Sequence, residues 1–246
     1  VPALPTLPGQ TMEAKDDGGE GKSADEGKSA GGGGGATRAL ASLGAAEIKI
    51  ETSPVTRGVV HDPEQREVSE AVEEEFGYAM MNIVSFEDLF GGKLHAAVDR
   101  QHPRDLYDVK LLYENEGFTD ELFRTFLIYV ASSPRPPHEL LNPNLINIDQ
   151  PYAREFEGMT KEAVDLTELI ATRDRLIGDI QSRMDVDAKR FLRTLHEGDP
   201  DFDAIDRPQA AELPAVRWKL INVNKLKAEN PKKHAAQGEE LEKLLG

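Results

Sequence analysis

Residues 91–112 place charged side chains where a helix would normally be apolar. At about 100° per residue, Lys93 lies at the centre of the helical face that carries Phe86 and Phe90. Arg100 lies seven residues further along the same face. Two glycines stand directly before Lys93, and each costs about 1 kcal/mol of helix stability relative to alanine. These glycines are expected to leave room beside the lysine.

A second predicted helix, which begins at Pro103, repeats the pattern with carboxylates. Asp105 falls within the apolar face that ends at Leu112, and Asp108 lies at the edge of this face. Arg104 stands four residues before Asp108 and is placed to pair with it. Because a buried unpaired charge is costly, these side chains must meet partners or line a wet cleft.

Two interpretations of these charges follow. In the first, Lys93 or Arg100 pairs with Asp105, and the ion pairs lock two helices together. In the second, the two helices line a cleft where Lys93 holds a phosphate and a carboxylate orients or deprotonates another group. The spacing alone is compatible with both.

The helices that carry these residues have clear boundary signals. Ser85, with Asp88 three residues later, predicts a helix N-terminus, and this helix should run to about Arg100. Pro103 suits the first position of the next helix, which Gly117 should end.

Strands and further helices complete an α+β pattern. Alternation of apolar and charged residues predicts a strand at 47–52, and an apolar run predicts another at 78–84. The further stretches with helical character are residues 119–132, 160–181, 186–196 and 215–228. In the helix that ends near Arg100, His95 is expected to be exposed. In the stretch 215–228, Trp218 is expected to belong to the core.

Residues 1–46 have the composition of a disordered segment. They are rich in glycine, serine and charged residues, so they offer too little apolar surface to offset the entropy of ordering the chain. Two origins for this segment are open: a native flexible tail, or a false leader created by a frameshift or a wrong start in the gene.

The bulk composition excludes several classes of protein. The chain has no cysteine, which fits a reducing cytoplasm, and no apolar run of the ~20 residues that a membrane span needs. The net charge of −16 argues against a general nucleic-acid-coating surface. A local basic segment near the C-terminus, with Lys219, Lys225 and Lys227, is either a solvated helix face or a landing site for RNA phosphates.

The stretch from Gly92 to Leu112, GKLHAAVDRQHPRDLYDVKLL, resembles the AbiEii/AbiGii toxin family of nucleotidyltransferases. The resemblance extends to IKIE, VSFEDLFGGK, YENEG, FEGMT and LPAVRWKLINVNKL, and so covers residue 47 to the end. It implies a small mixed sheet with metal-binding carboxylates, followed by helices. It also implies a toxin of a toxin–antitoxin or abortive-infection module that transfers a nucleoside monophosphate from an NTP to an acceptor, which in some relatives is tRNA.

The resemblance also implies roles for individual residues. Lys93 would neutralise the triphosphate with help from Arg100, and Asp108 would position the acceptor or the lysine, with Asp105 and Arg104 beside it. The family's Asp-x-Asp pair, which binds two Mg²⁺ ions, has no counterpart before residue 48 of this chain. Glu51 could be a third metal ligand of such a site, but alone it cannot hold Mg²⁺.

The combined prediction is an α+β protein in three parts. Residues 1–46 are a disordered low-complexity segment, 47–130 the remnant of a nucleotidyltransferase domain with a partial mixed sheet, and 131–246 a helical C-terminal domain. The predicted function is that of a cytoplasmic nucleotidyltransferase-like toxin with Mg²⁺ and NTP as family-implied cofactors and a cognate antitoxin as partner. For lack of the Asp-x-Asp motif the chain is expected to be inactive. The alternative is a non-catalytic remnant that binds RNA or the antitoxin.

Overall fold

The structure, a computed structural model, describes the backbone of residues 11–14, 37–43 and 46–52, and all atoms of residues 57–246. The contacts between residues divide the chain into two units, Val1–Thr56 and Arg57–Gly246.

The first unit contains a three-stranded antiparallel sheet in the order β1-β2-β3. Its strands are β1 (Thr11–Ala14), β2 (Thr37–Leu43) and β3 (Ala46–Thr52). The strand predicted at residues 47–52 is therefore confirmed. For β1 and β2 the structure differs from the expected disorder of residues 1–46, because β1 pairs with β2 and β2 pairs with β3, which gives these short stretches backbone partners. The other residues of that segment lie outside the described ones.

The second unit begins with a two-stranded hairpin. Strand β4 (Glu64–Glu67) pairs antiparallel with β5 (Met80–Ile83), and the acidic helix α1 (Glu70–Phe76) lies between them in sequence. Most side chains of these three elements are exposed. The apolar run at residues 78–84 is thus a strand, as predicted.

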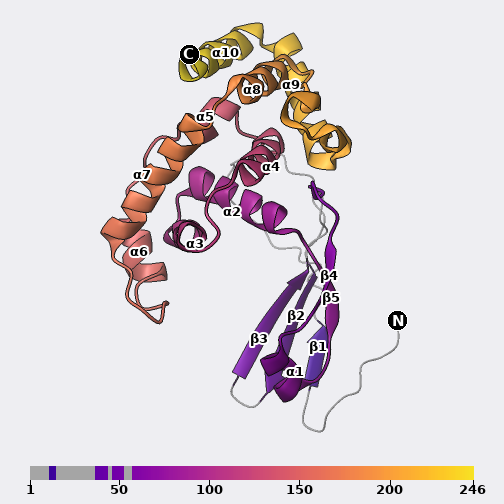
Figure 1. The fold of residues 1–246 in the computed structure, drawn as a ribbon, viewed down its shortest axis with the longest axis vertical. Helices are drawn as coiled ribbons and strands as arrows, with labels where there is room; N and C mark the ends of the chain where they lie inside the picture. Colours follow the sequence, from indigo (N-terminus) through magenta and orange to yellow (C-terminus); the bar gives the residue numbers. More distant parts are fainter. Residues whose placement is uncertain (1–10, 15–36, 44–45, 53–56) are drawn as a thin grey trace, which may run out of the picture. The chain divides into compact units, whose positions relative to one another are not determined.

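Helices make up the rest of the second unit (Figure 1). They are α2 (Phe86–Arg100), α3 (Pro103–Glu114), α4 (Asp120–Ala131), α5 (Pro137–Leu141), α6 (Asp149–Glu155), α7 (Leu166–Ser182), α8 (Val186–Glu197), α9 (Pro214–Glu229) and α10 (Pro231–Leu245), with short 3₁₀ helices η1 (Phe202–Ile205) and η2 (Pro208–Glu212). Helix α2 packs against α4 on one side and α3 on the other, and α3 also packs against α7. The predicted helices are confirmed, whereas α5, α6 and α10 were not predicted.

The core lies between α2, α3, α4, α7 and α8. Helix α4 is buried over most of its surface, and its Leu122, Phe126 and Leu127 have no exposed area. Leu94 of α2 and Leu106 of α3 are equally buried. Helix α2 therefore reaches the core while one of its edges stays in solvent, which is the edge that carries Lys93.

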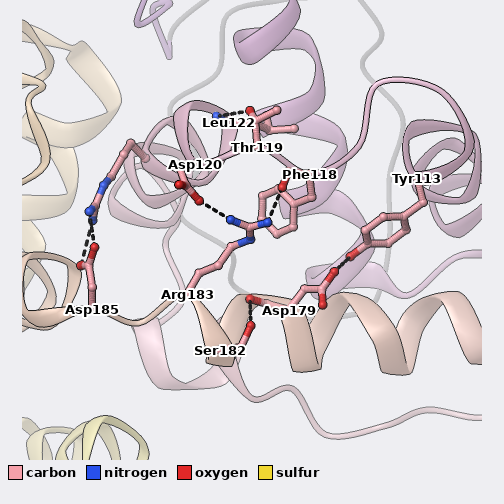
Figure 2. Close-up of polar contacts among 10 residues, drawn as sticks. Tyr113, Phe118, Thr119, Asp120, Leu122, Asp179, Ser182, Arg183 and Asp185 are labelled. Carbon is pink, nitrogen blue, oxygen red and sulfur yellow. Dashed lines mark hydrogen bonds and ion pairs between the residues drawn. The ribbon is translucent and has the colours of Figure 1, made fainter.

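Ion pairs join the N-terminus of α4 to the loop between α7 and α8 (Figure 2). Arg183 donates to the carboxylate of Asp120 and to the carbonyl oxygen of Phe118, and its guanidinium lies 5.0 Å from the centre of the Phe118 ring. Arg124 of α4 donates in return to both oxygens of Asp185, the N-cap of α8. These reciprocal contacts fix three helices that approach one another at their ends.

The fold class is α+β with a mainly helical C-terminal half, as predicted. All strand pairings among the described residues are antiparallel, so the mixed sheet of the prediction is not seen there. No described helix is long and apolar enough to cross a lipid bilayer. The three-part domain division remains a prediction.

Candidate active site on the α2–α3 hairpin

The start of α2 is fixed by its predicted cap. The hydroxyl oxygen of Ser85 accepts a hydrogen bond from the backbone N–H of Asp88 at 3.0 Å, and the same hydroxyl donates to the Asp88 carboxylate at 3.0 Å. Asp88 stands five residues before Lys93, or about one and a half turns. Because the cap fixes where α2 begins, it also fixes the position of Lys93 along the helix.

Lys93 and Asp108 form an ion pair between α2 and α3. The Lys93 Nζ lies 2.5 Å from Asp108 Oδ2, and the two side chains are 31% and 33% exposed. This pair is neither buried nor fully solvated. The structure thus brings together the two residues to which the family resemblance gives the central roles, at a place that a ligand can reach.

The face of α2 that carries Lys93 is only partly buried: Ala97 is fully buried and Phe86 and Phe90 pack against the core, but Leu89 is 46% exposed. A second buried face lies on the side opposite Lys93, and it consists of Gly91, Leu94, His95 and Val98. Lys93 therefore lies at the solvent edge of the contact with α3. The sequence pattern was misleading because α2 contacts two helices and so has two apolar sides.

Arg100 and Asp105 form the second ion pair of the hairpin. Arg100 Nη2 donates to Asp105 Oδ1 at 2.7 Å, and the arginine side chain is 63% exposed while that of the aspartate is 13% exposed. The other Asp105 oxygen is buried and has no hydrogen-bond partner among the described residues. Of the two pairings considered for Asp105, the structure contains the one with Arg100.

Arg104 does not pair with Asp108. Its Nε donates to the backbone oxygen of Glu155 at 3.2 Å, and its Nη2 lies 3.7 Å from the Glu155 carboxylate. His102, the N-cap of α3, contacts the same carboxylate at 3.1 Å. Arg104 is therefore held toward the end of α6 and away from the Lys93–Asp108 pair.

The carboxylate of Asp88 joins three segments of the chain. Its Oδ1 accepts from the backbone N–H of Val60 at 2.8 Å and from the Tyr129 hydroxyl at 3.0 Å. Its Oδ2 accepts from the backbone N–H of His61 at 2.9 Å, in addition to the Ser85 hydroxyl. Sequence reasoning assigned Asp88 only to the helix cap, because contacts with residues 60, 61 and 129 leave no local signal.

The two glycines of α2 accommodate Tyr129 of α4, and not the lysine as predicted. A Cβ at Gly91 would lie 3.0 Å from the Tyr129 ring and 3.2 Å from the Thr125 methyl group. A Cβ at Gly92 would lie 3.4 Å from the ring, which is an ordinary contact. Burial and the Asp88 carboxylate both raise the pKa of the Tyr129 hydroxyl, so this hydroxyl stays protonated as a donor to Asp88.

His95 is buried, so the prediction that it is exposed is wrong. Its side chain is 5% exposed, and its Nε2 has no hydrogen-bond partner among the described residues. Burial lowers the pKa of His95 from 6.5 to about 4, against the opposing effect of Asp99. The imidazole is therefore neutral at neutral pH.

The three lysines predicted to bind RNA have different surroundings. Lys219 is 6% exposed and donates from its Nζ to the carbonyl oxygen of Arg135, so an RNA phosphate cannot reach it and its predicted role is wrong. Lys227 lies 2.5 Å from the Glu197 carboxylate, and Lys225 is exposed. Trp218 is 58% exposed, so its predicted place in the core is also wrong.

The predicted metal ligand Glu51 lies near the end of β3, across from Arg38 in the register. Its side chain is outside the part of the chain that the structure describes in full. Within that part, no three acidic or histidine side chains converge as a metal site. The described residues therefore do not provide a site for Mg²⁺.

Comparison with known proteins gives one match. The sequence model of "Nucleotidyl transferase AbiEii toxin, Type IV TA system" matches residues 9–222, which include β1–β3, the α2–α3 hairpin and the first half of α9. Searches of curated proteins and of solved structures find no match. Because the match covers most of the chain, the protein belongs to the AbiEii nucleotidyl transferase toxin family of type IV toxin–antitoxin systems.

Proposed function

We propose that the α2–α3 hairpin is the surface on which this toxin binds a nucleoside triphosphate. The observation that carries this proposal is the partly exposed ion pair between Lys93 and Asp108. An ammonium group has three N–H donors, so Lys93 can keep its bond to Asp108 and still donate to phosphate oxygens. Asp108 in this proposal positions the lysine.

Arg100 is the second cation of the proposed nucleotide surface. It lies seven residues after Lys93, which is about 10 Å along the helix, and most of its side chain is exposed. Asp105 binds one end of the guanidinium and leaves other N–H groups for a ligand. Two cations on one edge of α2 match the length of an extended triphosphate better than a single charge does.

The proposed reaction is the transfer of a nucleoside monophosphate from an NTP to an acceptor such as the 3′ end of tRNA. Such transfers in general require carboxylates that hold divalent ions, and Mg²⁺ would bridge the phosphates when bound. The described residues offer no such site, and no Asp-x-Asp pair precedes residue 48. We therefore propose that these 246 residues bind the nucleotide but transfer it poorly.

The family implies an antitoxin as the partner of this toxin. Nucleoside triphosphates and tRNA are cytoplasmic molecules, so the proposed reaction belongs in the cytoplasm. A protein that binds RNA or the antitoxin without any chemistry is the alternative, and it differs from the main proposal in having no affinity for NTP.

Calorimetric titration of the full chain with each NTP in the presence of Mg²⁺ tests nucleotide binding. The substitution Lys93→Ala should weaken binding at least tenfold, because a phosphate contact by a cation contributes more than 1.4 kcal/mol. Lys110→Ala is the matched control, since Lys110 is also a partly buried lysine of the hairpin and pairs with Glu114. Equal affinities of the two variants would refute the assignment of Lys93.

Transfer is measured separately with labelled NTP and total tRNA. The proposal expects incorporation near background for this chain. Efficient labelling would overturn the proposed lack of transfer, and binding of tRNA with no affinity for NTP would favour the alternative.

A further inference from the structure

Helix α9 presents an exposed apolar face that the proposed reaction does not use. Trp218 and Ile221 are each 58% exposed, and they lie three residues apart on one side of the helix. Lys225 is exposed on the same side, seven residues or about 10 Å from Trp218. A tryptophan can bury more apolar surface than almost any other side chain, so an exposed tryptophan beside an exposed isoleucine is typical of a binding surface.

The charge around this face is opposite to that of the whole protein. The chain has a net charge of −16, yet residues 217–233 contain six basic residues and one acidic residue, Glu229. Lys219 is buried, and Arg217 and Lys227 pair with glutamates. The lysines at positions 225, 232 and 233 are exposed, so the local positive charge is available to a ligand.

The other strongly exposed aromatic residues have acidic neighbours. Phe76 is 76% exposed and follows three consecutive glutamates in α1, and Tyr78 is 58% exposed and donates to Glu67 at 3.0 Å. A polyanion would be repelled there and attracted to α9. The molecule therefore contains both a candidate surface and an internal comparison for it.

We propose that the exposed face of α9 binds single-stranded nucleic acid. A base stacks on the indole ring of Trp218, and the adjoining phosphates lie near Lys225 and the two lysines at the start of α10. Stacking on an aromatic ring combined with phosphate contacts is how proteins bind unpaired strands without reading their sequence. This inference rests on the proposed function only in that the acceptor of the transfer is itself a nucleic acid. The competing occupant, an acidic protein segment, would use the charge but has no bases to stack.

Trp218 is the single tryptophan of the chain, so intrinsic fluorescence reports directly on this face. The full chain is titrated at low salt with an oligouridylate of about ten nucleotides, with an abasic oligomer of equal length, and with polyglutamate. The oligouridylate should quench the fluorescence in a saturable, salt-dependent manner, and the other two polyanions should not. Equal quenching by polyglutamate, or no response to the oligouridylate, would overturn the proposal.

Anisotropy of a labelled oligouridylate measures the affinities of the variants. Trp218→Ala should weaken binding roughly tenfold, while Trp218→Phe should keep most of the affinity because a smaller ring still stacks. Lys225→Glu should weaken binding and reduce the salt dependence. Phe76→Ala removes an even more exposed aromatic side chain from an acidic surface and should have no effect. A Trp218→Ala variant that binds as tightly as the unchanged protein would refute the stacking role.

These results separate the new site from the proposed nucleotide site. Binding of the oligouridylate by a chain that shows no affinity for NTP would leave the α9 site intact and remove only the nucleotide site. Binding of NTP that depends on Lys93, together with an oligouridylate affinity that is unchanged in the Trp218→Ala variant, would remove the α9 site and leave the nucleotide site.

Discussion

Replacing the buried carboxylate of Asp88 by an amide, Asp88→Asn, should destabilise the second unit of the chain. The carboxylate is 2% exposed and accepts four hydrogen bonds, two on each oxygen, from donors in residues 60, 61, 85 and 129. An asparagine keeps one acceptor oxygen and turns two N–H donors toward two of the existing donors. The Ser85 or Tyr129 hydroxyl can rotate to accept instead, but a backbone N–H cannot.

The size of the effect follows from this count. One backbone donor, that of Val60 or His61, loses its acceptor, which costs about 1–3 kcal/mol when the donor is buried. The bonds that remain lose the extra strength that a charged acceptor provides, which is about 1 kcal/mol in total. The loss of a buried charge offsets part of this, so we expect the free energy of unfolding to fall by about 2 kcal/mol.

Urea denaturation of the full chain measures this loss, and hydrogen exchange locates it. The amides of Val60 and His61 should lose protection selectively in Asp88→Asn. Tyr129→Phe is the graded control, since it removes one of the four donors and should cost only about 1 kcal/mol. If Asp88→Asn loses less than about 1 kcal/mol and both amides stay protected, the assignment of Asp88 as their acceptor is wrong.

Three further predictions concern two buried ionisable side chains and the two glycines of α2. The pKa of His95 is lowered to about 4, so on acidification the unfolded state takes up the proton before the folded state does, and stability should fall by about 3 kcal/mol as the pH drops from 6.5 toward 4, at 1.36 kcal/mol per pKa unit. His95→Leu should remove this loss in denaturation measured between pH 7 and pH 4.5. A pH profile of stability that is the same in the variant and the unchanged protein would refute the prediction. Burial lowers the pKa of Lys219 to about 8, so the folded state loses this proton first and stability should rise between pH 8 and pH 10.5, the ordinary pKa of a lysine. In thermal melts Lys219→Met should abolish that rise. Anisotropy should show an unchanged RNA affinity for the same variant. Gly92→Ala should stabilise the protein by up to about 1 kcal/mol, whereas Gly91→Ala should destabilise it because the added methyl group meets the Tyr129 ring. Urea denaturation measures both free energies of unfolding. A Gly91→Ala variant more stable than Gly92→Ala would contradict the packing of α2 on α4.

The ends of the helices were predictable because their signals are local. The Ser85 hydroxyl that caps α2 and the proline that begins α3 act within one turn of the chain, so their effect is written in adjacent residues. The family resemblance left two roles open for Asp108, positioning the acceptor or positioning Lys93, and the structure contains its pairing with Lys93. Their type and spacing alone left a cleft and a salt-bridge network equally open.

The side that each helix buries was decided by the tertiary structure. Helix α9 has two rival apolar faces, one with Val216 and Leu220 and the other with Trp218 and Ile221, and only its contacts with α4, α8 and η2 select the first. That choice also buries Lys219 on the selected side.

The sequence by itself determined six of the described helices, the starts of α2 and α3, and the family of this protein, but not α5, α6 or α10. Only the tertiary structure decided that Asp88 would gather four donors and that His95 would be buried without a partner for its Nε2 among the described residues. The physical reason is that caps and periodicity depend on neighbours within a few residues. Burial and long-range hydrogen bonds depend instead on which faces remain free once all the helices have packed.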